Sequence, residues 1–281
     1  MSKTGLICAG GGMKGMYGCG ILDYFIDNSI NFDYCVAVSS GAANAAAFLA
    51  GQKGRNFRFY HDYPKNKNYS GFYPFFKTGS FFNLQYIYGE LTDVIDPINY
   101  KNIQKSKTDM EIVATNIISG KAEYFSKNDY LVDNCKIIMA SCAVPIICKP
   151  VKLNEQLYID GGVAEPIPVD RCFEKDCDKI VCILPRSIDK AKKPENFHLL
   201  YKHFLKDYPN SVHALEERHT VYNNSLKKLK KLCNDGKAVI INPEEINLNM
   251  FSKNKKAMKN LYDSGVEDAE KKIEEIKEFI K

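Results

Sequence analysis

The chain has 281 residues, of which 45% are hydrophobic and 26% are charged, and these proportions are typical of a globular protein and exclude wholesale disorder. The formal net charge is +5, and it lies entirely in residues 171–281, because residues 1–170 carry 16 basic and 16 acidic side chains. So small a charge does not indicate nucleic-acid binding, and we interpret it as a solvated lysine-rich surface that also suits weak attraction to an anionic membrane.

The first half of the chain alternates short apolar strands with helices. Residues 6–9 predict a strand that ends in a glycine cluster, and the apolar spacing over residues 15–28 predicts a helix. A second buried strand is expected at residues 34–39, followed by an alanine-rich helix at residues 40–51. This order of elements implies a parallel sheet covered by helices.

The rest of the chain is less regular. Residues 63–82 hold five Phe, two Pro and two Gly, and we interpret them as a loop or irregular segment. They are a candidate wall of a substrate pocket, lid or membrane contact, although the simpler explanation is that their aromatic side chains pack on the core. Further strands are expected at 110–118, 121–125, 151–160 (with a turn at Asn154-Glu155), 179–184 and 238–241, and further helices at 131–143, 168–175, 212–233 and 255–280, with a helical stretch beginning at Pro194.

The composition changes after Pro185, and we divide the chain near residue 207. Residues 1–206 are expected to form a catalytic α/β domain, and residues 207–281 a mostly helical extension. No apolar run reaches the roughly 18 residues of a membrane-spanning helix, and the first residues lack the features of a signal peptide. The expected location is the cytoplasm. The ten cysteines show no CxxC pair, and we expect reduced, mostly buried thiols.

A glycine-rich segment connects the first predicted strand to the first predicted helix. Its glycines let the backbone approach a ligand closely, and the helix N-terminus behind it adds partial positive charge, so it predicts an anion site. The segment also matches the dinucleotide fingerprint GxGxxG, but no Asp or Glu lies in residues 34–51 to bind a ribose, and we do not favour that function. The segment consists of Gly10, Gly11, Gly12, Met13, Lys14 and Gly15.

The second predicted strand runs into a helix through the sequence AVSSG. A sharp strand–turn–helix elbow displays a serine hydroxyl and needs small residues two positions before and after that serine. Ser39 has Ala37 and Gly41 at these positions, whereas Ser40 has a β-branched residue two positions before it. Ser39 is therefore the preferred nucleophile, although a serine at the start of a helix is also a common N-cap.

Asp160 follows a predicted strand and begins the sequence DGG with Gly161 and Gly162. Alone, this sequence indicates only an Asp-Gly turn. A serine nucleophile needs a base, and none of the five histidines lies in a strand-end loop of the kind that carries a triad histidine. A Ser–Asp dyad, in which Asp160 accepts the proton of Ser39 directly, explains both the aspartate and the missing histidine.

These motifs, in this order, resemble the patatin-like phospholipase family. The matching sequences are GGGMKG at 10–15, AVSSG at 37–41, ASCAVP at 140–145 with KPV at 149–151, DGG at 160–162 and PIPV at 166–169. The one departure is Ala37, where the family has glycine. The resemblance covers roughly residues 4–185, and residues 213–270 look like the C-terminal extension of one group of bacterial patatin-family proteins.

The resemblance implies a three-layer α/β/α sandwich with a mainly parallel central sheet, followed by the helical extension. It implies Ser39 as nucleophile, Asp160 as general base and an oxyanion hole of backbone N–H groups from residues 10–15. The implied reaction is hydrolysis of a lipid or acyl ester without a cofactor or metal, with peripheral membrane contact and no nucleic-acid partner. The alternatives are a transacylase and a non-catalytic acyl-binding protein, and the sequence gives no oligomeric state.

Overall fold

The computed structural model describes residues 2–133, 135–194, 198–246, 248 and 251–281. Within these residues eight strands form one sheet with the order β5-β6-β3-β2-β1-β7-β8, and β4 pairs with β3 outside this path. The strands are β1 (Thr4–Cys8), β2 (Tyr34–Val38), β3 (Asp109–Asn116), β4 (Ala122–Ser126), β5 (Val151–Leu153), β6 (Gln156–Asp160), β7 (Lys179–Ile183) and β8 (Ala238–Ile241).

The core of the sheet is parallel. β3, β2, β1, β7 and β8 run in one direction, whereas β4 and β6 pair antiparallel with β3, and β5 pairs antiparallel with β6. β1 and β2 are buried along their whole length, as expected of strands covered on both faces. The predicted mainly parallel sheet is confirmed.

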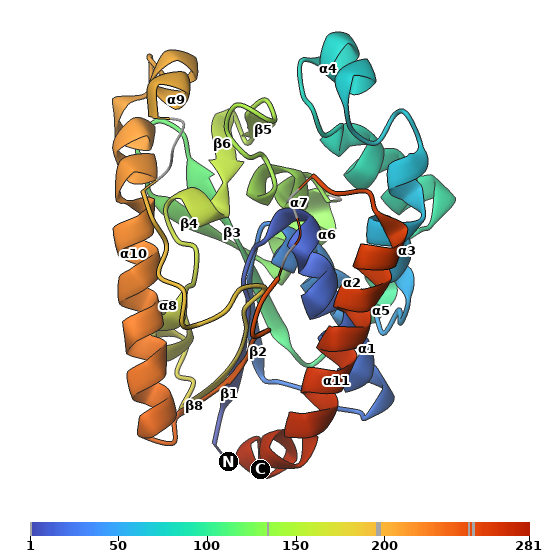
Figure 1. Cartoon of the computed structure of the whole chain (residues 1–281), viewed down its shortest axis with the longest axis vertical. Helices are drawn as coiled ribbons and strands as arrows, with labels where there is room; N and C mark the ends of the chain where they lie inside the picture. The colour runs from blue at the N-terminus through green and yellow to red at the C-terminus, as the bar shows by residue number, and fades with distance from the viewer. Residues whose placement is uncertain (1, 134, 195–197, 247, 249–250) are drawn as a thin grey trace.

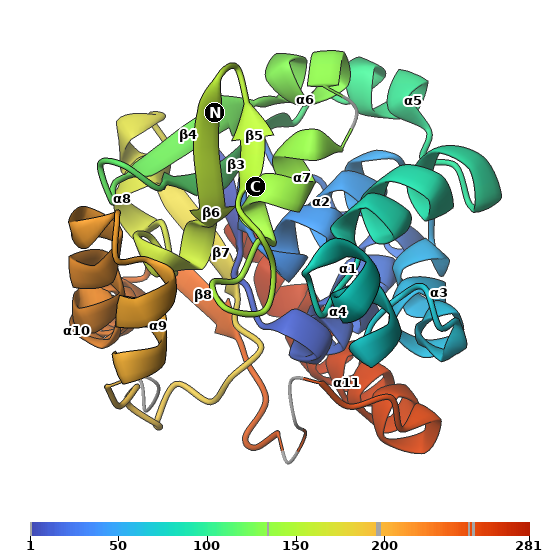
Figure 2. The same ribbon diagram turned by 90° about the horizontal axis from the view of Figure 1, so that it is seen from above.

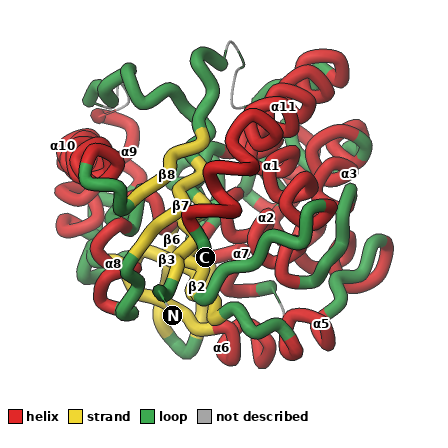
Figure 3. Tube along the Cα trace, turned by 90° about the horizontal axis from the view of Figure 1, so that it is seen from below, coloured by secondary structure: helices red, strands yellow, loops and turns green. Residues whose placement is uncertain are grey.

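Helices cover both faces of the sheet and produce three layers (Figure 1 and Figure 3). On one face α1, α2 and α11 contribute to the larger core, which includes Ile21 and Leu261. On the other face α8 and α10 contribute to a second core, which includes Cys172 and Leu229. The helices are α1 (Met16–Asp27), α2 (Ser40–Leu49), α3 (Arg55–His61), α4 (Phe72–Thr78), α5 (Tyr100–Lys105), α6 (Lys127–Asp133), α7 (Lys136–Ser141), α8 (Val169–Glu174), α9 (His198–Phe204), α10 (Pro209–Asn234) and α11 (Lys255–Phe279), with the 3₁₀ segments η1 (Gly12–Gly15), η2 (Tyr63–Lys65) and η4 (Gly161–Val163) and the π-helix η3 (Tyr86–Ile95).

Two predicted segments differ from the structure. Residues 63–82, expected to be irregular, contain η2 and α4, because Gly71 and Gly79 adopt φ angles of +120° and +78° at the two ends of α4. The single helix expected at 131–143 is divided into α6 and α7, and Cys135 at φ +53° begins the second helix in a conformation that a continuous helix excludes.

Other helices lie where the sequence made no prediction. These are α3, α5 and η3, and all three belong to the region between β2 and β3. The helical stretch predicted from Pro194 includes residues 195–197, which lie outside the described residues, and the structure has α9 from His198. α9 and α4 stand at the same end of the molecule, on either side of β5 and β6 (Figure 1 and Figure 2).

The C-terminal part of the chain completes the fold. β8 pairs with β7 at the edge of the sheet, and α11 lies along α1 (Figure 1). The two helices approach closely at glycines: a Cβ atom on Gly20 would lie 2.2 Å from the Tyr262 carbonyl oxygen, and one on Gly265 would lie 2.1 Å from that of Tyr17. The predicted division near residue 207 falls just before α10.

Two further features of the described residues concern membrane spans and cysteines. Within the described parts of the chain, no helix combines the length and the apolar character that crossing a bilayer requires. All ten cysteines are free and nine of them are buried, as the sequence predicted.

Candidate active site

The chain makes a sharp turn at Ser39, between the end of β2 and the start of α2. The φ and ψ angles of Ser39 are +54° and −129°, a combination that residues other than glycine rarely adopt. Gly41 permits the turn, because a Cβ atom there would lie 2.2 Å from the Cys8 carbonyl oxygen of β1. Ala37 is buried in β2 opposite Cys8. The Ser39 side chain therefore projects at the carboxyl edge of the parallel strands.

Asp160 lies at the end of β6 and faces Ser39. The Ser39 hydroxyl donates a hydrogen bond to Asp160 Oδ2 over 2.6 Å, and the other carboxylate oxygen, Oδ1, accepts one from the Gly162 N–H over 2.8 Å. Both side chains are buried. The Asp160 N–H donates to the Ala143 carbonyl, so the main chain also holds the aspartate in place. The serine and the aspartate, which are 121 residues apart, form a direct pair.

Burial raises the pKa of Asp160 above its ordinary value, because a desolvated carboxylate is less stable than the neutral acid. The positive charge of Arg218 opposes this shift most strongly, followed by the hydrogen bond from Ser39. Arg218 comes from α10, and its Nε–H donates to the Gly162 carbonyl. A carboxylate with a raised pKa is a stronger base, which suits proton transfer from a hydroxyl group.

The glycine-rich segment lies directly against Ser39. A Cβ atom on Gly10 would lie 2.8 Å from the Ser39 Cβ, so only glycine allows this approach. The Gly11 N–H donates to the Ser40 hydroxyl over 3.0 Å, and Gly12 adopts a φ angle of +57° at the start of η1. The main chain of the segment thus packs directly on the turn that carries Ser39 and Ser40.

The remaining predicted residues lie around this centre. Met13 is buried and lines a cavity with Ser39, whereas Gly15 accepts a hydrogen bond from Asn44 through its carbonyl. Lys14 lines the cavity that contains the serine and the aspartate, and burial and the neighbouring Arg186 lower its pKa. In Gly161, an added Cβ would lie 2.1 Å from the Val113 carbonyl of β3, so this glycine lets the DGG turn pack on the sheet.

Two cavities of different character meet at Ser39. One, of about 280 Å³, contains both members of the pair and is partly lined by basic side chains. The other, of about 70 Å³, is mostly apolar, and its lining includes Phe82, Leu84 and Ile147. An ester placed at Ser39 would therefore have a polar space on one side and an apolar space on the other.

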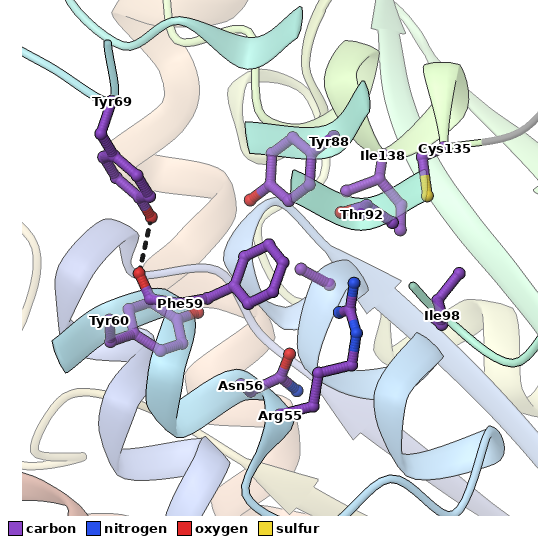
Figure 4. Close-up of a pocket in the computed structure, with 11 residues that line it drawn as sticks. Arg55, Asn56, Phe59, Tyr60, Tyr69, Tyr88, Thr92, Ile98, Cys135 and Ile138 are labelled. Atoms are coloured by element: carbon purple, nitrogen blue, oxygen red, sulfur yellow. Dashed lines mark hydrogen bonds between the residues drawn. The ribbon is translucent and has the colours of Figure 1, made fainter. Parts of the chain in front are cut away.

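The apolar cavity ends at a wall of tyrosines. Tyr60, Tyr69 and Tyr88 line it and also line a smaller neighbouring cavity of about 20 Å³, drawn in Figure 4. In Figure 4 Tyr69 donates to the Phe59 carbonyl, over 2.9 Å. The smaller cavity beyond the wall is lined by apolar side chains together with the buried Arg55. An apolar chain that enters beside Ser39 would stop at these tyrosines.

Three contributors to the site were given no chemical role by the sequence. The Ser141 hydroxyl accepts the N–H of Ser39 over 2.8 Å. Arg218 of α10 and Lys192, which precedes α9, line the cavity that contains Ser39 and Asp160, and their charges oppose the rise that burial causes in the pKa of Asp160. Ser141 lies in the family-like sequence ASCAVP, and this motif could have indicated that Ser141 lies near the site. Nothing in the sequence around Lys192 indicated that its side chain lines the cavity.

The histidines lie away from the serine. None of the described histidine side chains lines either cavity that contains Ser39. The described histidines are His61, His203, His213 and His219, and the side chain of His198 is outside the described residues.

The fold and this site define an α/β/α protein that carries a serine at a strand–helix elbow, hydrogen-bonded to an aspartate. The family model described as patatin-like phospholipase matches residues 6–173, and the chain belongs to that family of lipid acyl hydrolases. A second model, a domain of unknown function (DUF6363), matches residues 208–281.

Two known proteins are similar to the chain. The uncharacterized protein YjjU of Escherichia coli (strain K12) is 27% identical over 194 residues, which are 64% of this chain and 51% of YjjU. The match thus spans about half the length of that relative. The crystal structure of VipD from Legionella pneumophila has a TM-score of 0.45 and 14% sequence identity, over 96% of this chain and 67% of VipD.

Proposed function

We propose that the protein is a serine acyl hydrolase that cleaves acyl esters of lipids through Ser39 and Asp160. The observation that carries the proposal is the 2.6 Å hydrogen bond between the two side chains, formed in a buried cavity at a strained strand–helix turn. Membership of a lipid acyl hydrolase family supports a lipid as the substrate.

The geometry suggests the following steps. Asp160 takes the proton of Ser39 as the serine oxygen attacks the ester carbonyl. The N–H groups of residues 10–15 stabilise the negative charge on the carbonyl oxygen, and Gly12 is the first candidate because the Gly11 N–H already donates to the Ser40 hydroxyl. The alcohol leaves with the proton held by Asp160, and an acyl-serine remains. Asp160 then deprotonates a water molecule, which releases the fatty acid and restores the serine.

A fluorophosphonate probe tests the nucleophile directly. Intact-mass measurement should show one adduct on the wild type, none on Ser39→Ala and slow labelling of Asp160→Asn. Asp170→Asn is the matched control, because Asp170 is an exposed aspartate of α8, and this variant should react normally. We expect aryl-ester hydrolysis by Asp160→Asn to fall by about 10²–10⁴-fold.

Two outcomes would contradict the proposal. Near-normal hydrolysis by Ser39→Ala would exclude Ser39 as the nucleophile. A folded wild type that forms no adduct, even with lipid vesicles present, would favour the non-catalytic acyl-binding alternative. Product analysis with an added alcohol would separate hydrolysis from transacylation, because a transacylase forms a new ester.

We also propose that the protein works in the cytoplasm and touches the membrane through α4 and α9. Phe72 and Phe76 of α4 are 76% and 83% exposed, and Leu199 and Phe204 of α9 are also exposed. The two helices stand at the end of the molecule opposite the N-terminus, and β1 and its parallel neighbour β2 run towards that end (Figure 1). Residues 63–82 carry three Lys and no Asp or Glu, which favours an anionic lipid surface.

The double variant F72S/F76S tests this contact. It removes two large apolar side chains, so we expect its Kd for phosphatidylglycerol vesicles to rise at least about tenfold in a sedimentation assay. Val132→Ser is the control, because Val132 is equally exposed but belongs to α6. Equal binding by the wild type and the double variant would rule out α4 as a membrane contact.

A further inference from the structure

The cavity that contains Ser39 and Asp160 is strongly basic. Four basic side chains line it, and they come from separate parts of the chain. Among the described residues that line it, Asp160 is the single acidic one. The basic residues are Lys14, Arg186, Lys192 and Arg218. Such an excess of positive charge around one carboxylate favours an anionic ligand.

The positions of these side chains are fixed by the fold. The main chain at Lys192 is attached to α10 by two hydrogen bonds with Asn223, one of 2.8 Å and one of 2.9 Å. Arg186 follows β7, and its guanidinium lies 5.8 Å from the ring centre of Tyr222, another α10 residue that lines the cavity. α10 therefore supports two of the four basic groups and supplies a third, Arg218.

The four groups do not share one task. Arg218 donates to the Gly162 carbonyl, and its charge opposes the rise that burial causes in the pKa of Asp160. Its interactions with Asp160 and the DGG turn therefore account for the position of Arg218. Arg186 and Lys14 line the same cavity, so their positive charges face one space and repel each other; burial and, after it, Arg186 lower the pKa of Lys14. An anion bound between them would relieve this repulsion.

The two cavities at Ser39 give this anion a place in the substrate. Both are lined by Gly12, Ser39 and Val144, so the reacting ester bond lies where they meet. The apolar cavity suits the first carbons of the acyl chain beside the ester carbonyl, and the alcohol part of the ester then extends into the basic one. A basic cavity attracts a phosphate group, and it repels the quaternary ammonium of a choline head group.

We infer that this cavity selects glycerophospholipids with a net negative head group over zwitterionic ones, mainly through Arg186 and Lys192. The inference rests on the proposed ester hydrolysis at Ser39. It assigns a part in substrate choice to the C-terminal region, because α10 holds Lys192 at the cavity. Arg186 and Lys192 are specificity-determining residues and take no part in the bond-breaking steps.

The test compares phosphatidylglycerol with phosphatidylcholine of the same acyl chains, each diluted in nonionic micelles. We expect the wild type to have a kcat/KM at least about tenfold higher for phosphatidylglycerol. In Arg186→Gln and Lys192→Gln this ratio should fall towards one. Lys227→Gln is the matched control: it removes the same charge from an exposed residue of α10 that does not line the cavity, and its ratio should equal that of the wild type.

Each other outcome has a definite meaning. An unchanged ratio in both variants, or an equal loss in Lys227→Gln, would overturn the inference, since general attraction to the micelle would then explain the preference. Inorganic phosphate is a separate arm: if it inhibits aryl-ester hydrolysis and the lipids are not distinguished, the cavity binds a free anion instead.

A binding experiment keeps the inference testable even if no hydrolysis is found. Calorimetry with Ser39→Ala should show tighter binding of short-chain phosphatidylglycerol than of short-chain phosphatidylcholine, and adding Arg186→Gln should remove the difference. Absence of turnover together with this selective binding would disprove the proposed hydrolysis alone. Equal binding of the two lipids would disprove the head-group selection.

Discussion

Ser39 keeps a strained backbone conformation, and neighbouring groups stabilise it. Positive φ angles at residues other than glycine cost roughly 1–3 kcal/mol. The Ser39 N–H is buried with the turn, and it is satisfied by the Ser141 hydroxyl over 2.8 Å. Ser141 is itself completely buried. This hydrogen bond thus helps to hold Ser39 in the orientation that brings its hydroxyl to Asp160.

Ser141→Ala should therefore affect both stability and reactivity. The substitution leaves the buried N–H of Ser39 without its acceptor, so we expect the free energy of unfolding to fall by about 1–3 kcal/mol. Urea denaturation measures this loss, and the labelling rate with a fluorophosphonate should fall as well. Ser119→Ala, at an exposed turn, should change stability by less than about 0.5 kcal/mol. Wild-type stability in Ser141→Ala would show that the turn does not depend on this bond.

The pH dependence of hydrolysis should report the ionisation of Asp160. Only the carboxylate can accept the serine proton, so kcat/KM should fall as the pH drops through the pKa of Asp160. Because burial raises that pKa, this acid limb should lie above the ordinary aspartate value of about 3.9. Arg218→Gln removes a positive charge that lowers the pKa, and the limb should move to still higher pH.

The control for this measurement is Arg218→Lys. It keeps the charge but loses the guanidinium bond to the Gly162 carbonyl. We expect Arg218→Lys to keep the acid limb near its wild-type pH but to lower the maximal rate. This result would separate the effect of the positive charge on the pKa of Asp160 from the effect of the guanidinium on the position of the DGG turn. An acid limb that is the same in all three proteins would show that Asp160 does not control the rate.

At the level of elements, the contact of the α2 N-terminus with β1 determines where the serine lies. Gly41→Ala would place a Cβ atom 2.2 Å from the Cys8 carbonyl, and a backbone atom in a central strand cannot move away cheaply. We expect a loss of about 3 kcal/mol or more in the free energy of unfolding, measured by denaturation. Gly236→Ala is the comparison: its φ is +66° but its surroundings are open, so it should cost only about 1 kcal/mol. Equal losses would mean that the contact with β1 is unimportant.

The sequence predicted the elements whose pattern is local and regular. Buried apolar runs indicated β1, β2 and β7, because burial on both faces leaves a continuous apolar run. Long amphipathic patterns indicated α10 and α11, because burial on one face leaves a helical periodicity. The short helix α4 was missed, since its exposed Phe and Tyr side chains show no amphipathic pattern and its limits depend on the φ angles of two glycines.

The same distinction holds for the site. Ser39, Asp160 and the glycine segment were identified because each occupies a strand end, where the chain must turn. Arg218 and Lys192 were not given a role, because a lysine or arginine on a polar helix or loop is usually solvated. Their approach to Asp160 depends on how α10 folds back over the sheet, and no local pattern records that.

For the whole molecule, the C-terminal region is connected to the rest through both cores. Leu229 of α10 belongs to the second core, and Met258 and Ile276 of α11 belong to the larger core. β8 covers the edge of β7. We propose the division near residue 207 as a boundary between two regions of the sequence. Because both regions contribute side chains to these cores, the folding of residues 1–206 on their own needs a direct test.

A chain that ends at residue 206 tests this dependence. It loses β8, α10 and α11, so the edge of β7 and the apolar faces of α1 and the sheet become exposed. We expect no cooperative thermal transition by circular dichroism and no fluorophosphonate adduct, because Arg218 and the support for Lys192 are also missing. Co-expression of residues 207–281 as a separate chain should restore both, since these contacts are not covalent. A truncated chain that unfolds cooperatively and labels at the wild-type rate would show that residues 1–206 are an independent domain, with the extension as an addition to a complete enzyme.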